Sequence, residues 1–123
     1  MSDGAGPWRI LLVDDSRDDA ELTEIALRDA GLAFTCRRAD TADTVRAALA
    51  GFAPQLVISD LNLPGFSGEE ALALARAHDP ALPFVYLTGS LFLGEPPPEP
   101  VEGLLLKDDL APLPGLVRQL LEA

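Results

Sequence analysis

The chain has little cysteine, little positive charge and no long apolar run, and each shortage excludes a class of protein. One cysteine among 123 residues allows no internal disulfide, so nothing points to an oxidising compartment. The formal net charge of −11 argues against nucleic acid or an anionic membrane as a direct partner. No apolar run approaches the ~20 residues that a membrane-spanning helix needs. We therefore predict a cytoplasmic protein with neither a nucleic-acid nor a membrane partner.

The N-terminus of the chain shows no targeting signal. The start, MSDGAGPW, is neither basic nor apolar, so it does not resemble a signal peptide. We expect residues 1–8 to form a mobile N-terminal tail and residues 9–123 to form one domain. With 48 % apolar residues, this length is enough to bury a core. The last predicted helix ends near the last residue of the chain, so we expect no attached output domain.

Short apolar runs alternate with helical patterns along the chain. The runs predict five strands, at Arg9–Val13, Phe34–Arg38, Leu56–Ser59, Phe84–Leu87 and Leu104–Leu106. The predicted helices begin with caps at Asp18, Thr41 and Ser67, and a last helix covers Leu113–Glu122. The apolar face of the first helix is predicted at Leu22, Ile25 and Ala26. This alternation is typical of an α/β fold with a parallel sheet.

Prolines are concentrated between the fourth and fifth predicted strands, in Glu95–Pro100. A proline inside a helix costs ~3 kcal/mol, and the proline-free stretch Gly89–Glu95 contains two glycines. We therefore predict that the helix expected in this interval is absent or vestigial, and that an extended link replaces it.

Polar residues follow four of the five predicted strands. They are Asp14 and Asp15, Asp60, Thr88 and Lys107, the only lysine in the chain. In an open parallel sheet, ligands bind beyond the carboxyl ends of the strands. Three carboxylates gathered there would repel one another by about 4 kcal/mol per contact at ~4 Å, unless a cation joined them. Oxygen ligands favour Mg²⁺ or Mn²⁺, and a carboxylate beside such an ion can attack a phosphoryl donor.

Each of these residues also has an ordinary structural explanation. An aspartate pair after a strand commonly caps a helix, and a threonine in LTGS fits simple turn chemistry. Lys107 stands beside two aspartates and could form a surface ion pair with them. The metal site is favoured only because all five residues fall at the predicted strand ends of one chain.

Four segments together resemble the receiver domain of bacterial two-component response regulators. They are ILLVDD, LVISDLNLPGFSG, VYLTGS and LLLKDDL, and the resemblance extends from Arg9 to the C-terminus. It implies a flavodoxin-like, doubly wound parallel sheet of five strands in the order 2-1-3-4-5. It also implies a signalling domain that is not an enzyme in the usual sense.

The resemblance assigns a role to each candidate residue. Asp60 would be the phosphoacceptor, Asp15 would bind Mg²⁺ directly, and Asp14 would assist through water. The backbone carbonyl of Asn62 would complete the metal ligands. Thr88 would follow the phosphoryl group, and Lys107 would bind one of its oxygens. The phosphodonor would be a phosphohistidine on a sensor histidine kinase or a histidine phosphotransfer protein, and the downstream partner would be another protein.

Three positions depart from the family pattern. Leu104 stands where an aromatic switch residue is usual, Asp108 replaces the usual proline after the lysine, and Pro96–Pro100 interrupts the fourth helix. Asn62 and Ser90 occupy variable positions that influence hydrolysis of the phosphoryl group in this family. We expect output through the first or last helix or the proline segment.

Two other functions stay open. A receiver-like scaffold could bind a partner constitutively through its altered face, without phosphorylation. A phosphohydrolase with an aspartate nucleophile would want a second acid where Asn62 stands, and also a longer chain or a cap domain.

Overall fold

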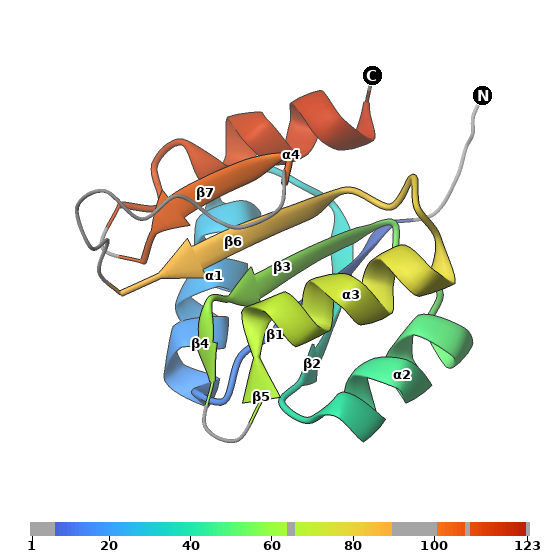
Figure 1. Ribbon diagram of the computed structural model, residues 1–123. Helices are drawn as coiled ribbons and strands as arrows, with labels where there is room; N and C mark the ends of the chain where they lie inside the picture. Colours follow the sequence, from blue (N-terminus) through green and yellow to red (C-terminus); the bar gives the residue numbers. More distant parts are fainter. Residues whose placement is uncertain (1–6, 64–65, 90–100, 108, 123) are drawn as a thin grey trace.

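The computed structural model describes residues 7–63, 66–89, 101–107 and 109–122 (Figure 1). Its centre is a sheet of five parallel strands in the spatial order β2-β1-β3-β6-β7. These strands are β1 (Trp8–Val13), β2 (Phe34–Ala39), β3 (Leu56–Asp60), β6 (Phe84–Thr88) and β7 (Gly103–Leu106). Numbered along the chain, the order is 2-1-3-4-5, so the predicted flavodoxin-like sheet is confirmed.

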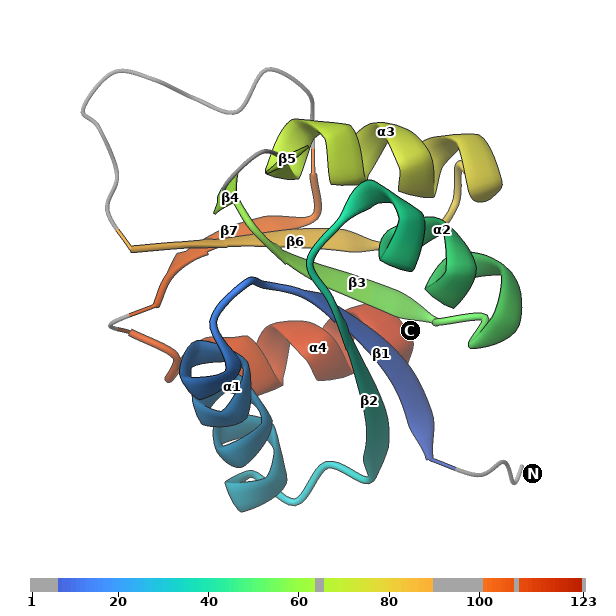
Figure 2. The same ribbon diagram turned by 90° about the horizontal axis from the view of Figure 1, so that it is seen from below.

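Helices cover both faces of this sheet. Within the described residues they are α1 (Arg17–Asp29), α2 (Ala42–Gly51), α3 (Gly68–His78) and α4 (Leu113–Leu121). Figure 2 shows α1 and α4 on one face and α2 and α3 on the other. Two short antiparallel strands, β4 (Asn62–Leu63) and β5 (Phe66–Ser67), connect β3 to α3. Among the described residues, none of the helices has the length and apolar character that a membrane span requires.

The central strands are buried on both faces, as their continuous apolar runs predict. Alternate residues of a strand point to opposite faces, so the sheet divides the core into two layers. The layer beneath α2 and α3 contains Leu11, Val13, Val57, Phe84 and Tyr86. The layer beneath α1 and α4 contains Ile10, Leu12, Ile58, Val85 and Leu87.

Two of the three predicted helix caps are confirmed, and one is wrong. Thr41 caps α2 by accepting a hydrogen bond from Thr44 N, and Ser67 caps α3 by accepting one from Glu70 N. The cap of α1 is Ser16 rather than Asp18, because the Ser16 hydroxyl accepts from Asp19 N at 3.2 Å. The helix therefore begins directly after the turn that follows β1.

The predicted buried face of α1 is also wrong. Leu22 and Ile25 are 56 % and 41 % exposed, whereas Ala20, Thr23 and Leu27 are buried. Two residues of helix correspond to about 200° of rotation, so Leu22 points away from the side on which Ala20 packs. The buried face of α1 is therefore formed by Ala20, Thr23 and Leu27, while Leu22 and Ile25 remain at the surface.

The remaining boundaries differ little from those predicted. β1 and β7 each begin one residue earlier than expected, and Asp60 and Thr88 are the last residues of β3 and β6. The proline segment Pro96–Pro100, where a helix was predicted to be missing, lies outside the described residues. Residues 1–6 of the predicted tail lie outside them as well.

Candidate functional site

The carboxyl ends of β1 and β3 bring three aspartates together. Asp14 directly follows β1, Asp60 ends β3, and these two strands are neighbours with Val13 opposite Ser59. One carboxylate oxygen from each of Asp14, Asp15 and Asp60 lies within 4.8 Å of the others. Asp14 is 5 % exposed and Asp60 is 8 % exposed, while Asp15 faces solvent. Three oxygens at this spacing, open on one side, fit a hard divalent cation that keeps some of its water.

Lys107 reaches this cluster from β7, the strand at one edge of the sheet. It directly follows β7, and its backbone N–H donates to Thr88 O at 2.8 Å, which fixes it beside the end of β6. Its ammonium lies 3.0 Å from Asp14 Oδ2 and 2.9 Å from Asp60 Oδ2. The structure therefore brings Asp60 and Lys107 together with the predicted acid pair, Asp14 and Asp15, in one site.

A further carboxylate, that of Asp19, contacts Lys107 together with Asp14 and Asp60, and the sequence analysis missed it. Asp19 Oδ2 accepts a hydrogen bond of 2.8 Å from the Lys107 ammonium. Asp19 lies in the first turn of α1, four residues beyond Asp15. An acidic residue in this first turn was a usable signal, because α1 begins at the same edge of the sheet as the acid pair.

The turn that holds the acid pair is fixed by three hydrogen bonds. Ser16 N donates to Asp14 Oδ1 at 2.9 Å, and Asp14 N donates to Ala39 O at 3.0 Å. Arg38, near the end of β2, donates from Nη1 to the carbonyl oxygen of Asp14 at 3.0 Å. The Asp14 carboxylate is therefore held in place before any ligand arrives.

Burial and charge act in opposite directions on the titrating groups of this site. Burial raises the pKa of Asp14 above its ordinary value of 3.8, and hydrogen bonds from Ser16 N and Lys107 only partly oppose the rise. For Lys107, burial lowers the pKa, but hydrogen bonds to Asp19, Asp60 and Asp14 outweigh burial and raise it. The ammonium therefore stays charged. Since three carboxyl groups contact one ammonium and Asp15 lies beside two of them, the site retains an excess of acidic groups that a cation would balance.

Comparison with known proteins agrees with this geometry. Residues 10–91 match the family model described as the response regulator receiver domain. The chain belongs to this family. It is thus a receiver domain of two-component signalling, which is a signalling domain rather than a conventional enzyme. The match ends at residue 91, so the placement of Lys107 in the site comes from the structure.

Individual relatives point the same way. The receiver domain is 38 % identical over 80 residues to the response regulator protein FleR of Pseudomonas aeruginosa, covering 65 % of this chain and 16 % of FleR. A solved response regulator receiver protein from Pseudomonas putida is 28 % identical, with a TM-score of 0.74 and coverage of 94 % and 98 %. A solved putative response regulator from Chloroflexus aurantiacus is 26 % identical, with a TM-score of 0.78 and coverage of 95 % and 99 %. The chain spans only about a sixth of FleR.

Other predicted residues lie near the site with less detail. Thr88 ends β6, the strand between β3 and β7, and its side chain is 1 % exposed. Asn62 begins β4, two residues beyond Asp60, and its contribution to a metal site stays a prediction. Ser90 and Asp108 lie outside the described residues.

Leu104 occupies the position of the usual aromatic switch residue in this receiver domain. It lies on β7 opposite Tyr86 of β6 and is partly buried against the layer beneath α2 and α3. Leu104 has no aromatic ring, so it cannot act as the aromatic switch that the resemblance implies at this position.

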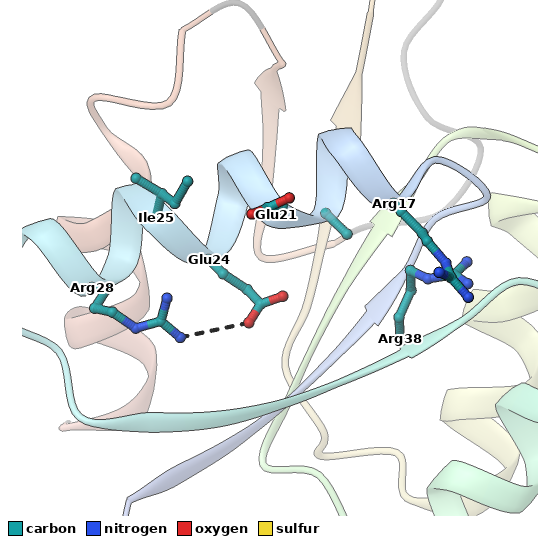
Figure 3. Close-up of a pocket in the computed structure, with 7 residues that line it drawn as sticks. Arg17, Glu21, Glu24, Ile25, Arg28 and Arg38 are labelled. Carbon is teal, nitrogen blue, oxygen red and sulfur yellow. Dashed lines mark ion pairs between the residues drawn. The ribbon is translucent and has the colours of Figure 1, made fainter.

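A groove lies along α1, between this helix and β2 (Figure 3). This groove of about 540 Å³ is lined at its ends by Arg17 with Arg38 and by Arg28 with Glu24. Arg28 and Glu24 form an ion pair of 3.7 Å across an exposed surface. None of the acidic residues around Lys107 lines the groove, so it is separate from the site described above.

Proposed function

We propose that this receiver domain accepts a phosphoryl group on Asp60 in a reaction that requires Mg²⁺. The observation that carries the proposal is the convergence of Asp14, Asp15 and Asp60 within 4.8 Å, with Lys107 2.9 Å from the Asp60 carboxylate. A structural explanation of these residues as caps or surface ion pairs accounts poorly for the two buried carboxylates of Asp14 and Asp60 beside a Lys107 side chain that is only 16 % exposed.

Each residue then has a distinct task. The Asp60 carboxylate attacks the phosphorus of a phosphohistidine, the P–N bond breaks, and an acyl phosphate forms on Asp60 while the histidine leaves. Lys107 balances the negative charge on the phosphoryl oxygens, and Thr88 donates to another of them. Asp14, Asp15, Asp60 and the Asn62 carbonyl would hold Mg²⁺, which supplies charge neutralisation at the transferring group when it is bound. The donor would be a sensor histidine kinase or a histidine phosphotransfer protein.

The output would be contact with a further protein. A shift of a few kcal/mol between two states is enough to change such a contact. Since Leu104 packs against the core, we expect the change to reach a partner through α1 or α4 rather than through an aromatic switch.

The test is the intact mass of the protein after incubation with MgCl₂ and a small acyl phosphate. We expect one phosphoryl adduct on the wild type, no adduct after chelation of the metal, and none on Asp60→Asn. Asp43→Asn is the matched control, because the Asp43 side chain is 95 % exposed and lies outside the site. An adduct-free wild type that also fails to bind Mg²⁺ would favour the alternative function, a scaffold that binds its partner without phosphorylation.

A further inference from the structure

From the contacts of Lys107, we infer that Asp19 is a positioning residue, which holds the Lys107 ammonium at the phosphoacceptor site during phosphoryl transfer. The inference rests on the proposed function. It assigns a role to a residue that neither the sequence motifs nor the metal-binding carboxylates include.

The first argument is the donor count of the ammonium. A lysine ammonium has three N–H donors, and Lys107 meets three carboxylates, at 2.8 Å on Asp19, 2.9 Å on Asp60 and 3.0 Å on Asp14. The Lys107 side chain is only 16 % exposed, so few of these bonds can be replaced by water without moving the side chain.

The second argument is that two of the three acceptors have another task. Asp14 and Asp60 belong to the carboxylate group that could hold a cation, and Asp60 is the proposed phosphoacceptor. When a cation and a phosphoryl group engage these oxygens, both acceptors are drawn away from Lys107. Asp19 is outside that group and remains available throughout, so it can retain the ammonium while the other contacts change.

The third argument is that Asp19 is itself well anchored. Its N–H donates to the Ser16 hydroxyl at 3.2 Å, and its carbonyl accepts from Thr23 Oγ1 at 3.1 Å. Thr23 is 3 % exposed, so the first turn of α1 is fixed to the interior. The Asp19 backbone is therefore fixed, and its short side chain has fewer rotatable bonds than the flexible four-carbon side chain of the lysine.

The experiment follows the rate of adduct formation by intact mass, with a small acyl phosphate and MgCl₂, in the wild-type chain and its variants. Asp19→Asn keeps both backbone bonds of the residue but loses the charged acceptor, and we expect about tenfold slower phosphorylation, the size expected for one charge-assisted hydrogen bond. Asp18→Asn removes the same charge from the adjacent exposed position and should stay within about twofold of the wild type, since surface charges contribute little. Asp19→Glu should recover part of the rate.

The decisive comparison uses a background without the lysine. If Asp19 acts through Lys107, then Asp19→Asn has no further effect on Lys107→Gln, and the two changes are not additive. A tenfold loss that persists without the lysine, or equal rates for Asp19→Asn and Asp18→Asn, would overturn the inference.

Two controls keep these outcomes distinct. Circular dichroism verifies that each variant is folded, and Asp19→Ser replaces Asp19→Asn if the latter unfolds, because serine is tolerated in a first helical turn. A wild type that forms no adduct contradicts the proposed function and the inference with it. A wild type that forms the adduct at a rate indifferent to Asp19 contradicts the inference alone.

Discussion

The Lys107 ammonium donates a hydrogen bond of 2.9 Å to Asp60 Oδ2, joining the first residue after β7 to the last residue of β3. These strands are not neighbours, because β6 lies between them in the sheet. The contact therefore spans the end of β6, where Thr88 is buried. The Lys107 ammonium thus links the carboxyl ends of β7 and β3, and it also contacts Asp14 after β1.

Loss of this cation should destabilise the folded protein. Lys107→Met leaves nearly buried carboxylates without their counter-charge, and we expect the free energy of unfolding to fall by about 3 kcal/mol in metal-free buffer. Added MgCl₂ should recover part of the loss, since a divalent cation balances the same carboxylates. Urea unfolding with and without MgCl₂ measures both effects. Arg46→Met is the control, because the 3.1 Å Arg46–Asp43 pair is exposed and should contribute under ~1 kcal/mol. Equal losses for the two variants would contradict the prediction.

Gly68 should tolerate no side chain. A Cβ atom there would lie 2.6 Å from Asp60 O and 2.9 Å from both Leu61 Cα and Tyr86 Cε1, so the backbone at Asp60 and Leu61 would have to move. We expect Gly68→Ala to lower the stability by about 2 kcal/mol, as overpacking does elsewhere. Gly115 of α4 has open space around its Cβ position, so Gly115→Ala should raise stability by up to ~1 kcal/mol through helix propensity. Thermal unfolding of the two variants should shift in opposite directions, and a shared direction would refute the argument.

The packing of α1 predicts unequal roles for two of its leucines. Leu27 is fully buried beside α4, so Leu27→Ala should lower the free energy of unfolding by about 3 kcal/mol. Leu22 is 56 % exposed, and Leu22→Ala should change it by no more than about 0.5 kcal/mol. Denaturant titrations of the pair decide the matter. The face originally expected from the sequence requires the reverse ranking.

The free energy of unfolding should decrease as the pH rises above 9.0, and the Cys36 thiol should be the first group to contribute to this decrease. Burial, with a smaller contribution from Glu24, raises the pKa of the Cys36 thiol from 9.0 to about 12. Between these two values the folded state keeps a proton that the unfolded state releases, so stability decreases as the pH rises through this range. Lys107, whose pKa is also raised, adds a further loss above its ordinary value of 10.5. In Cys36→Ala, the free energy of unfolding should not change with pH between pH 9.0 and the pH at which Lys107 begins to titrate. An unchanged slope would show that another group is responsible.

Much of the fold could be predicted from local patterns. The apolar runs located all five strands to within a residue or two, because buried parallel strands need continuous apolar sequence. Thr41 and Ser67 were identified as caps, because cap chemistry involves residues only three positions apart. The prediction of Asp18 as a cap was wrong, because Ser16 offers an equally good hydroxyl two residues earlier. In the structure the helix begins directly after Ser16.

The site was partly accessible in the same way. Once strands and helices alternate, every parallel strand ends at the same edge, so Asp14, Asp15, Asp60 and Lys107 had to meet there. The sequence by itself therefore determined the sheet, its order through the family resemblance, and the residues at its carboxyl edge.

Only the tertiary structure decided which side chains contact one another across that edge. The Asp19–Lys107 pair joins residues 88 positions apart, and no local pattern constrains such a contact. The rotation of α1, which exposes Leu22 and buries Ala20, likewise follows from how closely the helix packs on the sheet. Both depend on the distance between packed elements, a quantity set by the whole core and by no single segment of the chain.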